Sequence, residues 1–527
     1  MGGDAAGFGQ EVAVTVIDDL VDAIGDRIFG KKADKAPAKR SNRELTKYGY
    51  KRRDGGFADY VEPPLEFAAT SSQTAGLWPF CVGSSAALIG APLGRHILNG
   101  SVVCGDPMSL FVRGVVSSPS AMVMGLNGRG KSSVIVRMLL YLDSLGFVPL
   151  VLSDLKPDYV GVTQEIGGEV LRVGPGMGSV NPLDAGPLRA RLQELPADMQ
   201  KDMKQEMHNR RVSTLRGLLE LVRGKALDSD QQEPTVLSIA VRMAVERAES
   251  QGREPLIDDL VEVIEEAPQK MRAVTLSETA EEFRKVSRGL MIGLLGLGED
   301  GPFGDLFCRP TSVSMPEDRP VCFDVSAVDT SDSMMRAAIQ TVCWSYGQAV
   351  ASAAKSLADA GLAPERHHVM VMDEMWQVLR ASERLVYQID GITRLNRTKG
   401  LGQIMCTHTM KDMNLSTPEL TEIARGFLER SSVKIFGGMA ENEMPLLEAV
   451  IPLSNAEKRL LGEWSAEGAV DPNSGRTLPP PGRGRFMLKL GEGNPGVPFR
   501  MNLTPSEQKV HDTNEAWAEA MAGRQDR

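Results

Sequence analysis

The sequence has few of the residues that build disulfide-bonded or zinc-bound domains. Its 527 residues include six cysteines, scattered without a Cys-x-x-Cys pair, and six histidines. Disulfide frameworks and structural zinc sites need such residues at close, regular spacing. We therefore expect neither a disulfide framework nor a zinc site. The adjacent pair His367-His368 precedes an apolar run, which is typical of the start of a strand.

Long hydrophobic runs are missing as well. A helix that crosses a bilayer needs about 20 consecutive apolar residues. The most apolar irregular stretch, Cys81 to Gly94, is interrupted by glycine, serine and proline. From Met1 to Asp26 the chain carries acids where a secretory signal peptide has basic residues. These absences predict a cytoplasmic protein.

The composition excludes a disordered or fibrous chain. It is 42% hydrophobic and 24% charged, which is ordinary globular usage. The net charge of −10 hides a basic arm from Lys31 to Arg53, which holds ten Lys or Arg residues and two acids. Such an arm could bind nucleic acid, an anionic membrane surface or an acidic partner, or remain a solvated tail. The sequence leaves these alternatives open.

The order of apolar runs predicts an α/β fold with a largely parallel sheet flanked by helices, because short buried runs alternate with longer helical stretches. We divide the chain into an N-terminal appendage (1–75), a core (76–185 and 301–470), an all-helical insertion (186–300) and a C-terminal linker, strand and tail (471–527). The insertion shows only charged, amphipathic helical periodicity. The clearest strands are Ala121 to Met124, Val148 to Ser153, Glu169 to Val173, Val321 to Val325, Val369 to Met372, Gln403 to Thr407 and Val433 to Phe436.

The strongest motif is the segment Gly125-Leu-Asn-Gly-Arg-Gly-Lys-Ser132, which fits G-x-x-x-x-G-K-[ST] between an apolar strand and a helix. Its glycines allow backbone N–H groups to face phosphate oxygens, and the helix N-terminus adds a favourable dipole. Lys131 would contact the β- and γ-phosphates, and Ser132 would ligate Mg²⁺. We therefore predict that the chain binds ATP and Mg²⁺. The expected nucleotide-binding residues are Gly125, Asn127, Gly128, Arg129, Gly130, Lys131, Ser132 and Ser133.

Two carboxylates, Asp373 and Glu374, follow the buried strand Val369 to Met372. Open α/β sheets bind ligands at this carboxyl end of their strands. Asp373 would hold Mg²⁺ through water, and Glu374 would polarise the water that attacks the γ-phosphate. Together with the glycine-rich loop, this pair favours hydrolysis over nucleotide binding alone.

Three further polar segments have both a functional and a structural interpretation. Thr407-His408-Thr409 could sense the γ-phosphate or only cap a strand. The helix Glu383 to Lys399 ends in Arg394, Arg397 and Lys399, which could supply an arginine finger to a neighbouring subunit or only compensate the helix dipole. Asp154 is expected beside the phosphate loop, or the segment Asp154 to Tyr159 supplies only turn and cap residues.

The succession of these motifs, with Gly167-Gly168 and Asn181-Pro-Leu-Asp184 after the second strand, resembles the VirB-type motor ATPases of type IV secretion and conjugative transfer. These belong to the FtsK/HerA-like superfamily of hexameric P-loop pumps. The resemblance covers roughly Trp78 to Leu503 and includes the turn Gly301 to Phe307. The segment Asn181 to Asp184, with the glycine pair before it, is the discriminating part, because the phosphate loop alone is common to many NTPases.

The resemblance implies a RecA-like P-loop fold and a ring of subunits. It assigns catalysis to Lys131 and Glu374, metal binding to Ser132 and Asp373, the arginine finger to Arg397 and, by position, the sensor to His408. It also implies membrane-embedded channel proteins as partners, a DNA or nucleoprotein substrate, and a place at the inner face of the cell membrane. The family's sensor is usually Gln rather than His, and its long N-terminal domain is here shortened, lost or supplied by another chain.

Three functions therefore follow from the sequence. The leading one is an ATPase that drives a conjugative secretion apparatus. The second is a DNA translocase that pulls DNA through a basic pore. The third is a scaffold that binds nucleotide without hydrolysing it. This is the least favoured function, because Lys131, Asp373 and Glu374 are all present.

Overall fold

The structure is a computed structural model of the whole chain. It describes residues 45–46, 49–50, 88–227, 232–329, 331–381, 383–395, 400–470, 477–491 and 493–511. The chain divides into two compact units, Met1–Gly83 and Ser84–Arg527. In the first unit, β1 (Leu45–Thr46) pairs with β2 (Gly49–Tyr50) as an antiparallel hairpin. Apart from these four residues, the predicted appendage and its basic arm lie outside the described residues.

The second unit is built on an 11-stranded sheet in the order β4-β3-β15-β14-β11-β5-β10-β9-β6-β8-β7. From β11 to β7 every neighbouring pair is parallel. This part contains the expected strands: β5 (Ser120–Met124), β6 (Val148–Asp154), β7 (Glu169–Arg172), β8 (Val321–Asp324), β9 (His368–Met372), β10 (Leu401–Thr407) and β11 (Val433–Phe436). The predicted α/β fold with a largely parallel sheet is confirmed.

An antiparallel extension completes one edge of the sheet. It consists of β14 (Arg485–Leu490), β15 (Val497–Arg500), β3 (Pro92–His96) and β4 (Val102–Cys104). Of these, the sequence predicted only β14. The other three are short, and β3 carries proline, glycine and arginine, which weaken a strand pattern.

Both faces of the sheet are buried, as the near-continuous apolar strands require. Successive side chains of a strand point to opposite faces, and β5 shows this directly. Ala121 and Val123 belong to the apolar cluster that includes α4, whereas Met122 and Met124 belong to the cluster that includes α13. Helices of the first face are α3 (Pro107–Val112), α4 (Lys131–Ser144) and α5 (Val160–Glu165); those of the second are α13 (Ser333–Asp359), α14 (Trp376–Ala381), α15 (Glu383–Leu395) and α16 (Pro418–Arg430).

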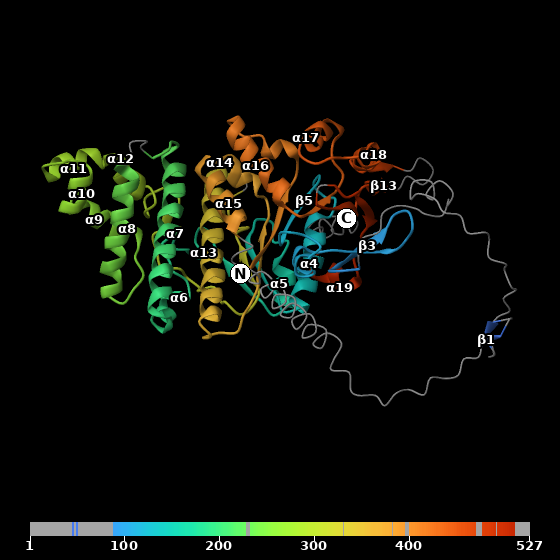
Figure 1. Cartoon of the computed structure of the whole chain (residues 1–527). Coiled ribbons are helices and arrows are strands. Elements are labelled where there is room, and N and C mark those ends of the chain that lie inside the picture. The colour runs from blue at the N-terminus through green and yellow to red at the C-terminus, as the bar shows by residue number, and fades with distance from the viewer. Residues whose placement is uncertain are drawn as a thin grey trace, which may run out of the picture. The chain divides into compact units, whose positions relative to one another are not determined.

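Between β7 and β8 the described residues form helices and no regular strand. The helices are α6 (Leu188–Arg191), α7 (Ala197–Arg223), α8 (Gln232–Ser250), α9 (Ile257–Glu265), α10 (Gln269–Val274), α11 (Ala280–Val286) and α12 (Arg288–Leu295). α7 contacts α13, and α8 contacts α7. Figure 1 shows this group of helices beyond α13, on the side away from α4.

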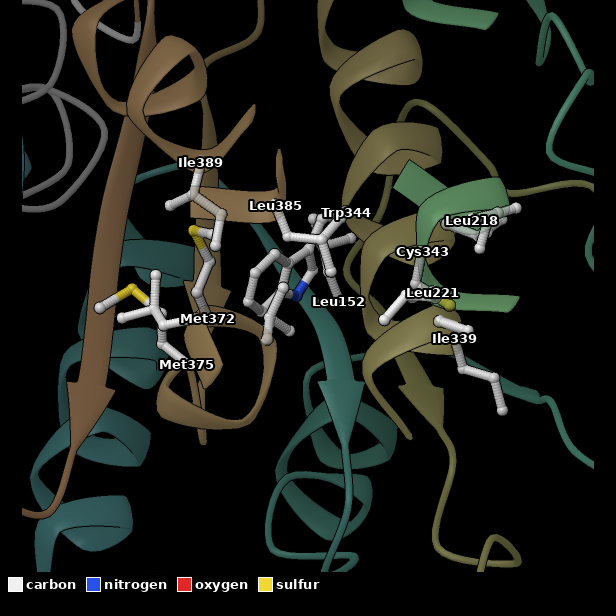
Figure 2. Close-up of a cluster of buried hydrophobic side chains, with 14 of the residues drawn as sticks. Leu152, Leu218, Leu221, Ile339, Cys343, Trp344, Met372, Met375, Leu385 and Ile389 are labelled. Carbon is white, nitrogen blue, oxygen red and sulfur yellow. The ribbon is translucent and has the colours of Figure 1, made fainter. Parts of the chain in front are cut away.

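The long helix α13 connects the helical segment to the sheet. Figure 2 shows its Trp344 in one apolar cluster with Leu152 of β6 and Leu385 of α15, while its Ile339 lies on the side of α7. Gly347 permits the close approach of α13 to β6, because a Cβ there would lie 2.4 Å from Leu152. α13 is therefore a buried layer between the sheet and the helical segment.

The C-terminal part contains three further helices and a pair of short antiparallel strands. These are α17 (Met444–Glu448), α18 (Asn455–Glu463), β12 (Ala469–Val470) paired with β13 (Thr477–Leu478), and α19 (Pro505–Val510). Among the residues that the structure describes, no helix is both long and apolar enough to cross a membrane.

The histidine at the start of β9 makes the fold sensitive to acid. His368 is 2% exposed, and its Nε2 lies 3.1 Å from the backbone oxygen of Glu317. Burial lowers its pKa from 6.5 to about 4. Between those two pH values the unfolded chain binds a proton that the folded chain does not, so stability falls as the pH drops. The free energy of unfolding should fall by about 3 kcal/mol at most.

We therefore expect the substitution His368→Gln to reduce the loss of stability between pH 6.5 and pH 4. Urea unfolding at both pH values measures it, with His367→Gln as the control because the His367 ring is 36% exposed. Equal acid losses in wild type and His368→Gln would contradict the interpretation.

Candidate nucleotide-binding site

The glycine-rich loop connects the end of β5 to the start of α4, as its sequence predicts. Gly128 (φ +71°) and Gly130 (φ +95°) both have left-handed backbone conformations, which a side chain would strain. Gly130 is the N-cap of α4, so free N–H groups of the first helical turn face the loop. The amino group of Lys131 donates to Leu126 O (3.3 Å) and Asn127 Oδ1 (3.4 Å). This is a cradle of donors suited to phosphate oxygens.

Segments from the C-terminal half hold this loop in place. The N–H of Gly437 donates to Met124 O (2.7 Å), and the N–H of Leu126 donates to Gly438 O (3.0 Å). Arg129 is 2% exposed, and its guanidinium donates to the carbonyls of Ser465 (2.9 Å) and Ala466 (3.1 Å). The side chain of Arg129 is therefore a structural tie. The predicted contact of Arg129 with the nucleotide stays a prediction.

The two predicted carboxylates lie at the carboxyl end of β9, and β10 separates β9 from β5. Asp373 and Glu374 therefore share an edge of the sheet with the phosphate loop and with His408, which follows β10. The turn after β10 is fixed by Asp412, whose Oδ2 accepts from Thr407 Oγ1 (3.1 Å) and from the N–H of Thr409 (2.9 Å).

Glu374 is the most constrained side chain of the site. Its Oε1 accepts from Lys156 Nζ (2.8 Å), its Oε2 accepts from Trp376 Nε1 (2.7 Å), and His408 Nε2 also lies 2.7 Å from Oε2. Its φ is +50°, a conformation that costs a non-glycine residue roughly 1–3 kcal/mol and is found mainly at functional sites. Burial alone would raise the pKa of Glu374, but the hydrogen bonds and charges of His408 and Lys156 hold it well below its usual range.

The segment after β6 supplies three of the site's contacts. Asp154 is 2% exposed and accepts from the N–H groups of Asp158 (3.0 Å) and Tyr159 (2.7 Å), which curls the chain. Burial raises the pKa of Asp154 to about 7. Asp158 Oδ2 accepts from Ser132 Oγ (2.9 Å), and the hydroxyl of Tyr159 donates to Asp373 Oδ2 (2.9 Å).

The expectation that Asp154 itself lies beside the phosphate loop was wrong. β10 and β9 both lie between β6 and β5 in the sheet. The contact with the loop is made four residues later, by Asp158. Asp154 acts on the site only by shaping the turn that carries Asp158.

The donor set fits a magnesium nucleotide. Mg²⁺ takes oxygen ligands and usually binds through one or two carboxylates plus phosphates. Ser132, Asp158 and Asp373 offer such oxygens. Asp158 accepts a hydrogen bond from Ser132, and Asp373 accepts one from Tyr159, which follows Asp158 in the chain. Burial and, to a smaller degree, the charge of Asp373 raise the pKa of Asp158, so a cation there would relieve repulsion between the two carboxylates.

Of the candidates for the arginine finger, the structure describes only Arg394. α15 is described as far as Leu395, and Arg394 in its last turn pairs with Asp390 (Nε–Oδ2 2.7 Å). Arg397 and Lys399 lie outside the described residues. The choice of Arg397 therefore stays a prediction.

Nothing in the sequence predicted Lys156 and Trp376 as partners of Glu374. Lys156 belongs to the polar segment after β6, and no motif linked it to a glutamate 218 residues away. Trp376, two residues after Glu374, belongs to none of the motifs. Only the placement of β6 beside β9 brings Lys156 to the site.

Comparisons with known proteins give a structural match without a sequence match. No protein-family model matches the chain, and no curated protein matches its sequence. The structure is similar to that of VirB4 of Thermoanaerobacter pseudethanolicus, with a TM-score of 0.58 and 18% identity over 81% of this chain and 100% of that one. The chain has the VirB4 fold.

A weaker similarity is to the plasmid coupling protein TrwB in complex with ADP and Mg²⁺. The TM-score is 0.43 and the identity 10%, over 73% of this chain and 86% of that one. The VirB4 match confirms the predicted fold, a large, mostly parallel sheet flanked by helices.

The hydroxyl of Tyr159 should matter for the metal. Tyr159 is fully buried, and its bond to Asp373 orients that carboxylate. We expect Tyr159→Phe to raise the Mg²⁺ concentration needed for half-maximal ATP binding by about tenfold, since outer contacts of metal ligands typically contribute 10–100-fold. A fluorescent ATP analogue titrated with Mg²⁺ measures this. The control is Tyr346→Phe, a buried tyrosine whose hydroxyl accepts from the N–H of Met315; equal Mg²⁺ dependence in both variants would contradict the role.

Proposed function

We propose that this chain is an ATPase that drives a type IV secretion or conjugative-transfer apparatus. One observation supports it most: Glu374, in a strained conformation, lies at the same sheet edge as a complete phosphate loop and Asp373. A protein that only binds nucleotide has no need for a carboxylate in that place. The VirB4 fold supports the choice of apparatus.

Each residue has a definite task in this proposal. The loop's N–H groups and Lys131 bind the β- and γ-phosphates, and Ser132 and Asp373 hold the magnesium ion, which neutralises charge on the phosphates when bound. Tyr159 fixes the orientation of Asp373. Glu374 orients the attacking water and accepts its proton, and His408, in contact with Glu374, transmits the state of the site to the turn after β10.

The arrangement in the cell follows from the same proposal. Subunits form a hexameric ring, as in the related pumps, with ATP between neighbours and Arg397 of one subunit reaching the nucleotide of the next. The ring lies in the cytoplasm against the inner face of the cell membrane, where membrane-embedded channel proteins receive it. Movement of the helical segment, carried by α13, would transmit the work of hydrolysis.

Steady-state ATP hydrolysis over a series of protein concentrations tests the proposal. Wild type should turn over ATP with a specific activity that rises with concentration, and Lys131→Ala should lose the activity. Glu374→Gln should still bind ATP but hydrolyse it at least about a hundredfold more slowly, the usual contribution of a general base. Lys355→Ala is the control, because Lys355 is paired with Asp359 on the surface of α13.

The same assay with single- and double-stranded DNA separates the alternatives. A secretion motor should ignore DNA. Strong stimulation by DNA that disappears with added salt would favour a DNA translocase, because phosphate contacts are salt-dependent. Absence of turnover under every condition would contradict the ATPase and favour a scaffold.

A further inference from the structure

The lysine after β6 has no place in the nucleotide-binding motifs, yet it touches the proposed general base. Lys156 Nζ lies 2.8 Å from Glu374 Oε1, and this contact joins two segments 218 residues apart in the chain. We propose that Lys156 is a positioning residue that restrains Glu374, and that their ion pair must open for hydrolysis. The proposal rests on the ATPase function proposed above.

The first reason is the number of donors on Glu374. A carboxylate has about four acceptor positions, and Lys156, Trp376 and His408 fill three of them. The fourth position lies on Oε1, which already accepts from the Lys156 ammonium and is therefore a weaker base for a proton from water. Lys156 is alone on Oε1 in these contacts, and its departure would free that oxygen completely.

The second reason is that Lys156 is the donor most able to leave. Its side chain is 58% exposed, whereas that of His408 is 17% exposed. Lysine has a long flexible stem and a strongly hydrated head, so its ammonium can exchange Glu374 for water at small cost. Trp376 and His408 are rigid rings held by α14 and by the turn after β10.

The third reason is the position of Lys156 in the chain. It lies two residues before Asp158, which binds Ser132 of the phosphate loop, and three before Tyr159, which binds Asp373. One short segment therefore contacts the metal-binding serine, the metal-binding aspartate and the base. A change at the nucleotide that shifts this segment would also shift Lys156 away from Glu374.

Removing the lysine should therefore release the base. We expect Lys156→Gln to raise kcat for ATP by roughly two- to fivefold, the factor that a partly exposed ion pair represents, with KM unchanged. Lys156→Arg keeps the charge and can pair with the carboxylate bidentately, so it should not raise kcat above the wild-type value. Lys355→Gln removes another surface-paired lysine and serves as the control. Thermal unfolding of each variant checks that the fold is retained.

Separate values of kcat and KM distinguish restraint of the base from a purely structural role. Loss of a structural contact would lower kcat or raise KM, whereas release of Glu374 should raise kcat alone.

The outcomes separate this inference from the proposed function. If wild type shows no turnover, the ATPase proposal fails first. If wild type is active and Lys156→Gln lowers kcat, raises KM or leaves kcat unchanged, Lys156 does not restrain Glu374 and the inference is overturned. A higher kcat with KM unchanged in Lys156→Gln, and no such increase in Lys156→Arg, supports it.

Discussion

The geometry of the site depends on one buried carboxylate that touches no reacting group. Asp154 must satisfy its oxygens inside the fold, and it does so with the backbone N–H groups of Asp158 and Tyr159. Those bonds set the curl of the chain after β6. Because of that curl, three neighbouring side chains reach three different targets. Lys156 contacts Glu374, Asp158 contacts Ser132 of the phosphate loop, and Tyr159 contacts Asp373 after β9. The chemistry of the site is therefore positioned from a strand that carries none of its main motifs.

The strand that carries Asp154 is also the one on which α13 packs. Leu152, two residues before Asp154, lies against α13 where Gly347 removes the side chain that would keep them apart. α13 in turn contacts α7 of the helical segment. Close-packed interiors transmit small displacements because they leave no room to absorb them. The helical segment and the nucleotide site are thus connected through two packed contacts and one turn.

Local patterns in the sequence predicted the local parts of this architecture. The phosphate loop between β5 and α4, the buried strand β9 that leads into Asp373 and Glu374, and the polar turn after β10 each follow from residues that are close together in the chain. The order of the strands could not be deduced in this way, and the expected neighbour of the phosphate loop, Asp154, was misplaced for that reason. The pairing of Lys156 with Glu374 and the burial of Arg129 also depend on contacts between distant segments. Short strands such as β3, with proline and glycine, gave no pattern to recognise.

The position of β5 in the sheet has a consequence for folding during synthesis on the ribosome. β5 lies between β10 and β11, so the strand that leads into the phosphate loop has no hydrogen-bonded neighbour until residues 401–436 have been synthesised. The outer strands β3 and β15 likewise pair across most of the chain. Such non-local pairing is slow and leaves apolar strands exposed in the meantime. A nascent chain therefore contains the complete phosphate-loop sequence before the two strands that flank β5 have been made.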